Sequence, residues 1–253
     1  MSITQCMSVV LCTTGNRLDE LKKNLISISQ QEVKTKLIVV CQCNDQKRKR
    51  IEEIINKVNI KADIVSDYGK GLSRARNLAI KQLECSKGFL IFADDDNWYP
   101  NEAFKEAIKI AETYNSDIYT FKYYDKVNDV FPKKYRKRKK NLNYINLNRV
   151  SSIEIMIDLE KVTLDKIYFD ENLGIGTDIP SGEENQLLFR LKKCGYNIMY
   201  YPFIFSYHPY KKNKRKIDGD FFSEKKQLFY KIYGKRLGRI MHILFFIKKK
   251  MKL

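Results

Sequence analysis

Short apolar runs alternate with amphipathic stretches through the first half of the chain. In one such stretch Leu18, Leu21, Leu25 and Ile28 recur at the spacing that places them on one face of a helix. Alternation of apolar runs and helices with short connections is typical of a mostly parallel sheet covered by helices on both faces. The pattern predicts strands at 8–11, 37–40, 62–65, 89–92 and 117–122, and helices at 18–29, 46–58, 73–83 and 101–114.

The second half of the chain has shorter and less regular segments. Two short apolar segments occupy 144–147 and 154–159. Residues 183–194 have the periodicity of a helix, which Gly195 would end. A strand is expected at 196–207. Because no repeat or low-complexity linker interrupts the chain, we expect these segments to complete the same α/β domain.

Composition is consistent with this fold class. With 253 residues, 43% hydrophobic and 12% aromatic, the chain can bury the core of one large α/β domain. Its six cysteines lie mostly in apolar contexts, which favours reduced thiols over disulfides, and Cys41 and Cys43 lack the nearby partners of a zinc site. No run reaches the roughly 18 apolar residues of a spanning helix, and no basic leader precedes residue 6, so we expect a cytoplasmic protein.

The formal net charge of +18 is concentrated in two places. Residues 133–140 carry seven Lys or Arg and no acid, and residues 211–253 carry fifteen Lys or Arg against three acids. The rest of the chain is close to neutral. Two basic patches on a neutral body favour an anionic partner, either a membrane leaflet or nucleic acid, although lysines kept for solubility give the same composition.

The basic tail from about residue 210 is expected to be helical. It contains the apolar run 240–247, which is followed directly by Lys248, Lys249 and Lys250. An apolar body with a cationic rim is typical of a segment that lies in a membrane interface, and it also fits a terminal helix docked on the domain. We predict a domain over 1–209 and a membrane-associating tail over 210–253.

Three adjacent carboxylates, Asp94, Asp95 and Asp96, follow the apolar run 89–92. Like charges repel, so a partner is needed, and a strand that ends in acids places them where open α/β sheets bind ligands. A divalent cation is the simplest partner, and alternating side-chain direction would place Asp94 and Asp96 on the same side. The alternative is a solvated acidic turn, in which Asn97 and Pro100 are ordinary turn residues.

An ordered set of motifs resembles family 2 glycosyltransferases from about residue 7 to 209. The motifs are Ser8-Val-Val-Leu-Cys-Thr-Thr-Gly-Asn-Arg17, Ser73-Arg-Ala-Arg-Asn77, Asp94-Asp-Asp96, Gly182-Glu-Glu184 and His208. The resemblance implies a GT-A fold, a nucleoside-diphosphate sugar as donor, Mn²⁺ or Mg²⁺, and inversion at the anomeric carbon. It also implies a donor-binding half over 1–124 and an acceptor-binding half over 125–209. A role in bacterial surface-polysaccharide assembly is expected, as in capsule or O-antigen synthesis.

The resemblance also assigns site residues on the donor side. It places the metal at Asp94, Asp96 and His208. Because a cation that bridges the two phosphates stabilises the departing diphosphate, carboxylates at this place suit the chemistry. The alternative for Thr14, together with Asn16, is to cap the first helix. The residues expected to contact the nucleotide, ribose or diphosphate are Thr13, Thr14, Arg17, Gln42, Lys70, Arg74, Arg76, Asp94 and Asp95.

The acceptor hydroxyl must lose a proton as it attacks, which requires a positioned carboxylate. Relatives commonly have Gly-Glu-Asp where this chain has Gly182-Glu183-Glu184, so Glu184 is the expected base and Glu183 is expected to bind acceptor or orient the loop. Either acid could instead complement a helix dipole. The segment 169–177, which contains two glycines, resembles the flexible acceptor loop of such enzymes.

The chain differs from the family pattern at a second place, after the second predicted strand. Relatives usually carry an Asp pair there, of which one recognises the base, and here the chain has Cys41-Gln42. Gln42 can both donate to and accept from a pyrimidine edge, so base binding could persist in altered form. A UDP-sugar is the expected donor, and this substitution weakens that expectation.

We therefore predict an inverting, metal-dependent glycosyltransferase that acts on a glycan or lipid-linked saccharide at the cytoplasmic face of a membrane, with no nucleic-acid partner. Three alternatives stay open. A nucleotidyltransferase would use a similar sheet and metal, although no glycine-rich phosphate loop lies near the first strand. A basic protein that binds nucleic acid would explain the charge but not the acidic site. A catalytically degenerate, membrane-bound protein would explain the departures at Gln42 and Glu184.

Overall fold

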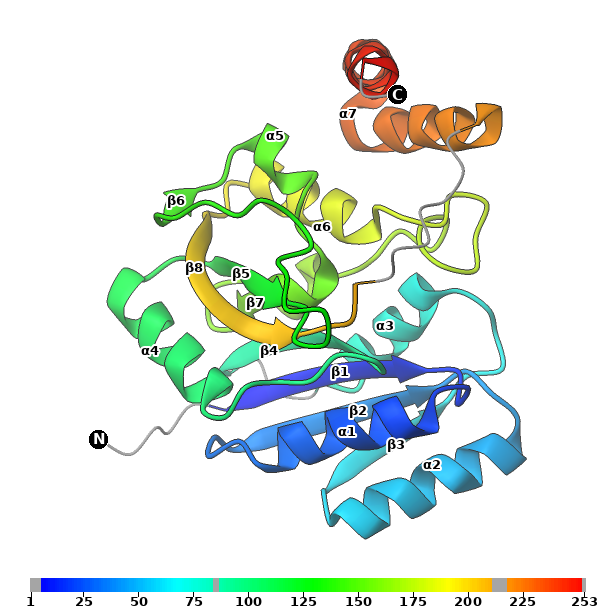
Figure 1. Ribbon diagram of the computed structural model, residues 1–253, viewed down its shortest axis with the longest axis vertical. Helices are drawn as coiled ribbons and strands as arrows, with labels where there is room; N and C mark the ends of the chain where they lie inside the picture. Colours follow the sequence, from blue (N-terminus) through cyan, green and yellow to red (C-terminus); the bar gives the residue numbers. More distant parts are fainter. Residues whose placement is uncertain (1–5, 84–86, 211–217, 252–253) are drawn as a thin grey trace.

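The computed structural model describes residues 6–83, 87–210 and 218–251. One eight-stranded sheet crosses the molecule in the order β3-β2-β1-β4-β7-β5-β8-β6 (Figure 1). The first four strands in this order pair in parallel, as do β5 and β8, whereas β7 and β6 pair antiparallel with their neighbours. The strands are β1 (Met7–Thr13), β2 (Thr35–Cys41), β3 (Ala62–Ser66), β4 (Phe89–Asp94), β5 (Ile118–Tyr124), β6 (Lys140–Asn141), β7 (Ile155–Asp158) and β8 (Ile198–Tyr207).

Helices cover both faces of this sheet, as the alternation predicts. The apolar side chains of α1, α2 and α4 pack in one buried cluster, and those of α3 and α6 pack in a second cluster on the opposite face. Successive residues of β1 point alternately into the two clusters, because side chains alternate along a strand. The helices are α1 (Leu18–Ser29), α2 (Asp45–Val58), α3 (Leu72–Lys81), α4 (Ala103–Tyr114), α5 (Tyr144–Leu147), α6 (Glu183–Lys193) and α7 (Gly219–Lys250).

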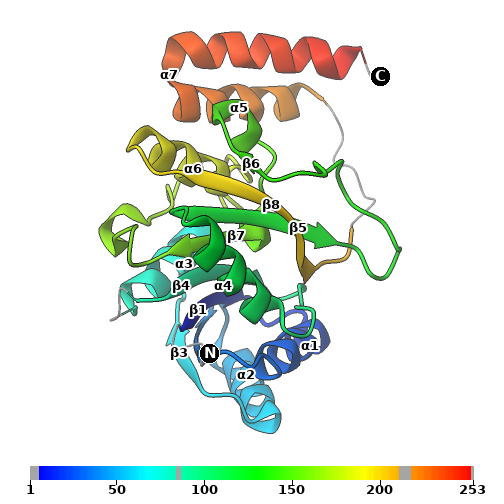
Figure 2. The same ribbon diagram turned by 90° about the vertical axis from the view of Figure 1, so that its left-hand side faces the viewer.

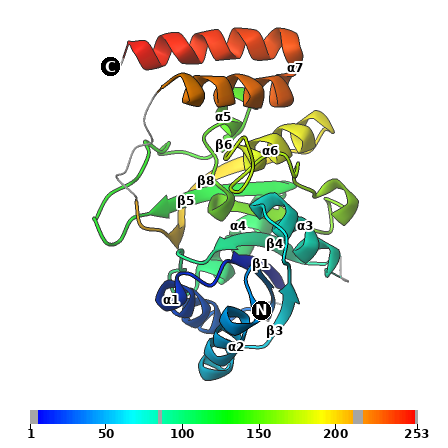
Figure 3. The same cartoon turned by 90° about the vertical axis from the view of Figure 1, so that its right-hand side faces the viewer.

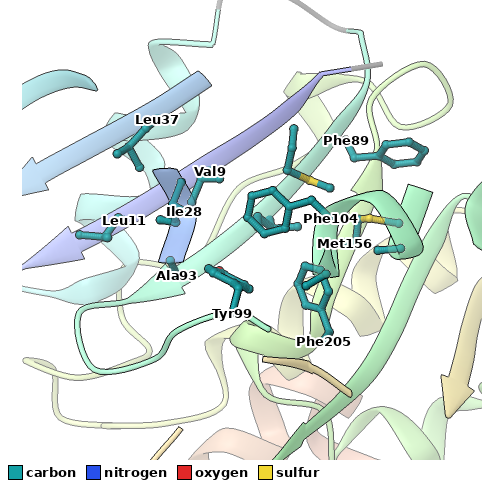
Figure 4. Packing of buried hydrophobic residues seen from close by; sticks show 14 of the residues in the cluster. Val9, Leu11, Ile28, Leu37, Phe89, Ala93, Tyr99, Phe104, Met156 and Phe205 are labelled. Carbon is teal, nitrogen blue, oxygen red and sulfur yellow. The ribbon is translucent and has the colours of Figure 1, made fainter. Parts of the chain in front are cut away.

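The first cluster contains the aromatic packing that anchors β8 to α4 and to the segment after β4. Tyr99, Phe104 and Phe205 meet with ring centroids 4.8 to 6.0 Å apart, beside Ala93 and Met156 (Figure 4). All five are at most 3% exposed. Contacts of this kind bury large apolar areas, so they fix the position of the β8 carboxyl end relative to β4.

The sheet has a topological switch point between β1 and β4. Strand order runs outward from β1 to β2 and β3 on one side, and the chain then returns to β4 on the other side. Register places Cys12 opposite Asp94 and Thr13 opposite Cys41. Open α/β sheets bind ligands in the crevice outside the strand carboxyl ends at this point. The ends of β1, β2 and β4 are therefore set side by side at one edge.

Several predicted boundaries shift by one to three residues. Segment 154–159 is a strand only over β7, which runs antiparallel between β4 and β5, so the sheet is mixed in its second half. The helix predicted from 101 starts at Ala103, after Glu102 in a left-handed conformation. Helix α6 ends at Lys193, and Gly195 follows with φ +97°, a conformation that glycine adopts without the Cβ penalty.

The C-terminal tail forms a helical hairpin. Gly234 breaks α7 with φ 76° and ψ 169°, so an inner helix and an outer helix stack antiparallel beside α5 and α6 (Figures 2 and 3). This confirms the prediction of a helical tail, while residues 211–217 and 252–253 of that tail lie outside the described residues. No described helix carries an apolar stretch long enough to span a bilayer.

Four cysteines of the described ranges, Cys12, Cys41, Cys43 and Cys194, are free thiols, as expected. Cys12 and Cys41 are buried, and burial raises the pKa of each to about 12, so these thiols are inert at neutral pH. Cys194 is exposed, in contrast to the predicted apolar setting. Cys85 lies outside the described residues.

Candidate active site

The acidic turn after β4 is held by two asparagines. The buried Asn24 of α1 donates from its side chain to the main-chain oxygens of Asp94 and Asn97, at 3.1 and 2.6 Å. The side-chain oxygen of Asn97 accepts from the Asp94 amide at 2.8 Å. A solvated turn would not need buried amides to fix its backbone, so these contacts favour a built site over an ordinary acidic turn.

Arg17 at the start of α1 compensates two of the three acids. Its guanidinium pairs with Asp95 at 2.6 Å and also with Asp96. Thr13 donates to the second oxygen of Asp95 at 2.9 Å. Burial raises the pKa of Asp95, and Arg17 and the Thr13 hydrogen bond oppose that rise. Arg17 itself is the N-cap residue of α1, without a side-chain cap bond, so Thr14 does not cap the helix.

Asp94, Asp96 and His208 come together as a group that could hold a cation. One ligand atom from each lies within 4.8 Å of the others. His208 follows β8, where its Nε2 lies 3.0 Å from Asp96 and its ring meets Tyr123 edge to face at 5.7 Å. Carboxylates suit Mn²⁺ and Mg²⁺, and the imidazole suits Mn²⁺ better than Mg²⁺. The donor set therefore fits the predicted metal, with Mn²⁺ as the better match.

A cavity of about 490 Å³ opens over these acids. Its walls come from the carboxyl ends of β1, β2 and β4, the 69–72 turn before α3, Ile175 and Gly176, and it falls within the usual range of ligand sites. The structure therefore brings together most of the residues predicted on the donor side. They are Thr13, Thr14, Arg17, Gln42, Lys70, Asp94, Asp95, Asp96 and His208.

Gln42 contacts protein groups at the edge of this cavity. Its amide nitrogen lies 2.9 Å from Asp67, 3.1 Å from the Gly69 oxygen and 3.2 Å from the Gly71 oxygen. Arg74 pairs with the same buried Asp67 at 3.0 Å and does not line the cavity. Burial alone would raise the pKa of Asp67, but hydrogen bonds from the Gly69 amide, Arg74 and Gln42 lower it. Gln42 thus holds the 69–71 turn that forms one wall.

Arg76 is a fully buried guanidinium with three partners. It is 1% exposed and pairs with Asp94 at 3.0 Å and Glu183 at 3.1 Å, and it donates to the Ser152 hydroxyl at 2.9 Å. The ring of Phe169 lies 5.3 Å from the guanidinium carbon. Arg76 therefore links a candidate metal ligand to the Gly-Glu-Glu motif and faces carboxylates, whereas Lys70 lines the donor cavity.

The Gly-Glu-Glu motif lies in a second cavity of about 250 Å³, which shares Asp94, His208 and Leu72 with the first. Glu183 and Glu184 form the first turn of α6. Glu183 is paired with Arg76, whereas Oε2 of Glu184 is buried with no hydrogen-bond partner among the described residues. Burial raises the pKa of Glu184 well above its usual range, and the neighbouring Glu183 adds to that rise. A carboxylate with a raised pKa suits the role of a general base.

The loop 170–182 joins the two cavities. Its Ile175 oxygen accepts from the Leu72 amide at 3.0 Å, and a Cβ on Gly176 would lie 3.0 Å from the Gly71 nitrogen. Gly174, at φ +100°, lies against Glu183 with equally little room for a Cβ. These two glycines allow the loop backbone to approach both the 69–71 turn and the Gly-Glu-Glu motif.

Sequence reasoning missed several supporting residues. Asp67 had a usable signal, because it is an acid directly after a predicted strand and before a glycine turn. Asn24 gave a weaker signal in the sequence, because it is a polar residue on the apolar face of the first helix. Ser152 and Tyr123, which contact Arg76 and His208, had none, because their contacts join segments distant in the sequence.

Fold and site together define an α/β protein that has a group of two acids and a histidine at the switch point of its sheet and a buried carboxylate beside it. The sequence model of glycosyl transferase family 2 matches residues 8–169. The chain belongs to this family, as the motifs predicted.

Among curated proteins, the poly(ribitol-phosphate) beta-N-acetylglucosaminyltransferase TarS of Staphylococcus aureus strains Mu50 and MW2 is 28% identical over 117 residues. That alignment covers 45% of this chain and 20% of TarS, so the chain spans about one fifth of this relative.

Solved structures show the same fold. The crystal structure of S. aureus TarS 1-349 has a TM-score of 0.68 at 19% identity, and the match covers 90% of this chain and 65% of that one. The structure of the same protein in complex with UDP has a TM-score of 0.66 at 17% identity, and the match covers 90% of this chain and 65% of that one. The structure of its complex with UDP-GlcNAc has a TM-score of 0.64 at 19% identity, and the match covers 90% of this chain and 66% of that one. These matches confirm the predicted GT-A fold.

Proposed function

We propose that this protein is an inverting, divalent-metal-dependent glycosyltransferase that moves a sugar from a UDP-sugar to a hydroxyl group of a surface glycan. The observation that carries the proposal is the arrangement of two adjoining cavities. One contains the Asp94, Asp96 and His208 group, the other contains Glu184, and Asp94 and His208 line both. A transferase of this kind needs a leaving-group site and a base on opposite sides of one reacting carbon.

The donor would occupy the larger cavity. We assign Asp94, Asp96 and His208 to a Mn²⁺ or Mg²⁺ ion, which when bound would neutralise charge on the diphosphate. Thr13, Thr14, Arg17, Gln42, Lys70 and Asp95 line the same cavity, so they are the candidates for contacts with the nucleotide. Structural relatives that hold UDP and UDP-GlcNAc support uridine as the base. We therefore retain UDP-sugar as the donor although Gln42 stands where relatives have Asp.

Glu184 is assigned as the base. Its carboxylate would take the proton of the acceptor hydroxyl as that oxygen forms a bond to the anomeric carbon. The bond from that carbon to the diphosphate breaks, and the electron pair leaves with the UDP. A single displacement from the opposite face inverts the anomeric configuration. Glu183, which Arg76 holds, orients the loop, so Glu183 and Arg76 are positioning residues.

The acceptor would occupy the smaller cavity, whose walls include Ser151, Pro180 and Ser181. The curated relative acts, by its name, on poly(ribitol-phosphate), which supports a cell-surface polymer as acceptor. Residues 1–124 would then bind the donor and 125–209 the acceptor. We place the reaction at the cytoplasmic face of a membrane, where lipid-linked acceptors are exposed, and attribute this placement to the basic tail 210–253.

The test is release of UDP from UDP-GlcNAc and other UDP-sugars by the full chain, with Mn²⁺, with Mg²⁺ and with a chelator. The proposal expects release that a divalent cation restores after chelation, and a product of inverted anomeric configuration by NMR when an acceptor is supplied. An equal rate of UDP release with and without the chelator would contradict the metal assignment. A nucleotidyl product in place of UDP would favour the nucleotidyltransferase alternative, and no turnover with any donor would favour a degenerate protein.

A further inference from the structure

The inner helix of α7 is docked on the acceptor loop. Its side chains Leu228 and Ile232 form a buried cluster with Leu173 and Ile179 of the loop 170–182. Leu228 packs on Gly182, where a Cβ would lie 2.6 Å from it, and Lys231 pairs with Asp170 at 3.0 Å. The inner helix is therefore an integral wall behind the acceptor cavity.

The outer helix of α7 has two apolar faces. One face packs on the inner helix: Phe245 and Phe246 lie 4.7 to 6.4 Å from Phe222, and Gly238 approaches the backbone of Phe229. The second face lies opposite the first at helical spacing and is exposed. Its members are 48 to 81% exposed: Leu237, Ile240, Ile243, Leu244, Ile247 and Met251.

Cations flank this exposed stripe on both sides. By helical position Arg239 and Lys250 lie along one edge and Lys248 along the other, with Arg236 near the start. The outer helix from 235 to 250 carries no acid. An apolar stripe with cationic edges, directed away from the body of the protein, is the pattern of a helix that lies in a membrane interface. Figures 2 and 3 show this helix as the outermost layer at that end of the molecule.

Of the partners that could cover the stripe, an anionic lipid surface matches both the apolar side chains and the cations at their edges. A second copy would cover the apolar residues, but it would bring two acid-free helices together, and like charges repel across such an interface. Nucleic acid would satisfy the cations and leave the apolar stripe in water. A bilayer with anionic headgroups accepts the stripe and attracts the cations.

We infer that the outer helix of α7 lies on an anionic bilayer along the stripe Leu237 to Met251, and that this holds the acceptor cavity close to the headgroups. The inference rests on the proposed function, because the distance between the cavity and the bilayer matters only if the cavity binds a membrane-linked acceptor. Two stacked helices of about 10 Å each separate Gly182 from the bilayer, so the cavity lies about 20 Å from the surface. A lipid-linked saccharide reaches that height with a few sugar units. The inner helix transmits the docked orientation to the loop 170–182, which leads directly into Glu183 and Glu184 at the start of α6.

The test is co-sedimentation of the full chain with vesicles of pure phosphatidylcholine and with vesicles that also contain phosphatidylglycerol. We expect binding to the anionic vesicles that weakens as salt rises from about 0.1 M to about 1 M, where the screening length falls from about 10 Å to about 3 Å. The variant I240S/L244S/I247S should lose at least about tenfold in partition coefficient, because three large apolar side chains no longer enter the interface. These side chains are exposed, so the variant should fold.

A matched control replaces exposed apolar residues elsewhere, Ile26→Ser and Val127→Ser, and should bind vesicles as the wild type does. Equal binding of the stripe variant and this control would overturn the inference. Dimerisation by light scattering that the stripe variant abolishes, without vesicle binding, would assign the stripe to a second copy. Stabilisation by UDP and Mn²⁺, measured on the same samples, separates the two claims, since it depends on the donor cavity and not on α7.

Discussion

The donor side and the acceptor side of this protein are built in different ways. The donor cavity is formed by the ends of parallel strands in continuous register, from Thr13 on β1 to Asp94 on β4, and by one short turn before α3. The acceptor cavity is formed by the segment 151–153, which enters a short 3₁₀ helix, by the loop 170–182 and by the first turn of α6, supported by a tail helix. The first is a rigid edge, whereas the second depends on packing between segments distant in the sequence.

Arg76, the shared cavity wall and the contacts of the loop 170–182 with the start of α3 connect the two sides. The buried Arg76 contacts Asp94 on the donor side and Glu183 on the acceptor side; the Glu183 contact is buried, whereas the Asp94 side chain is 31% exposed. Changes on the donor side should therefore abolish nucleotide binding and chemistry together. Changes on the acceptor side should reduce transfer while nucleotide binding persists.

The largest effect is expected from Asp96→Ala. Loss of this carboxylate removes one of the three candidate metal ligands and the partner of Arg17, and metal stabilisation of a leaving group is worth several kcal/mol. Turnover should fall about 10⁴-fold, and UDP should no longer bind in a cation-dependent way. UDP release is the measurement. Asp63→Ala, at an exposed acid of β3, is the matched control and should leave turnover unchanged. Retained turnover in Asp96→Ala would remove this residue from the site.

Glu184→Gln should reduce transfer about 10³-fold while UDP binding stays as in the wild type, because a general base contributes about 10² to 10⁴. Because the pKa of Glu184 is raised, the acidic limb of the wild-type rate profile should lie above the ordinary value of 4.5. Only the deprotonated base accepts a proton, so the rate should fall as the pH drops through that pKa.

The same variant should be more stable at alkaline pH. A raised pKa in the folded state means that folding is favoured while Glu184 is protonated, and this stability is lost as the pH rises through the folded pKa. Gln removes that loss, so Glu184→Gln should melt a few degrees higher at about pH 8 and equally at about pH 4. If Glu183→Gln abolishes transfer in a folded protein and Glu184→Gln does not, the two assignments are exchanged.

Arg76 connects the two sides, so its loss should affect both. Arg76→Ala leaves Asp94 and Glu183 without their buried partner, and breaking a buried pair typically costs about 3 to 5 kcal/mol of stability. Arg76→Lys keeps the positive charge but loses the planar guanidinium that donates to several partners at once. It should reduce turnover about 100-fold and cost less stability than Arg76→Ala. Arg48→Ala removes a partly exposed pair with Glu52 and a hydrogen bond to Ser66, and it should cost about 1 kcal/mol. Equal melting curves for Arg76→Lys, Arg48→Ala and the wild type would contradict the bridging role.

The smallest effect on catalysis is expected from Leu228→Ala on the inner helix of α7. A cavity behind Gly182 should loosen the loop, so the KM for acceptor should rise about tenfold. Hydrolysis of the donor without acceptor should stay within about twofold, because no donor-cavity residue contacts Leu228. Leu237→Ala, the same change at a side chain that is 49% exposed, is the control for kinetics in solution. A parallel loss of donor hydrolysis in Leu228→Ala would show that the two sides are not separable.

This difference between the sides explains what the sequence could predict. Strand and helix periodicity gave the order of β1 to β5, and an acid run after an apolar strand led directly to Asp94 and Asp96. Periodicity could not show that Gln42 and Arg74 both contact Asp67, or that Arg76 lies buried between two carboxylates, because each contact joins separate segments. Likewise the amphipathic run 240–247 indicated a helix, but only the break at Gly234 shows which face is left exposed.

The central claim is that the acidic centre binds a nucleoside diphosphate through a cation. The most direct test is thermal stabilisation of the full chain by UDP, dTDP and GDP, each with Mn²⁺ and with a chelator. We predict that UDP with Mn²⁺ raises the melting temperature, as a ligand that binds only the folded state must, and that the chelator or Asp96→Ala removes the increase. An equal increase with and without the cation, or no increase with any nucleotide, would contradict the account.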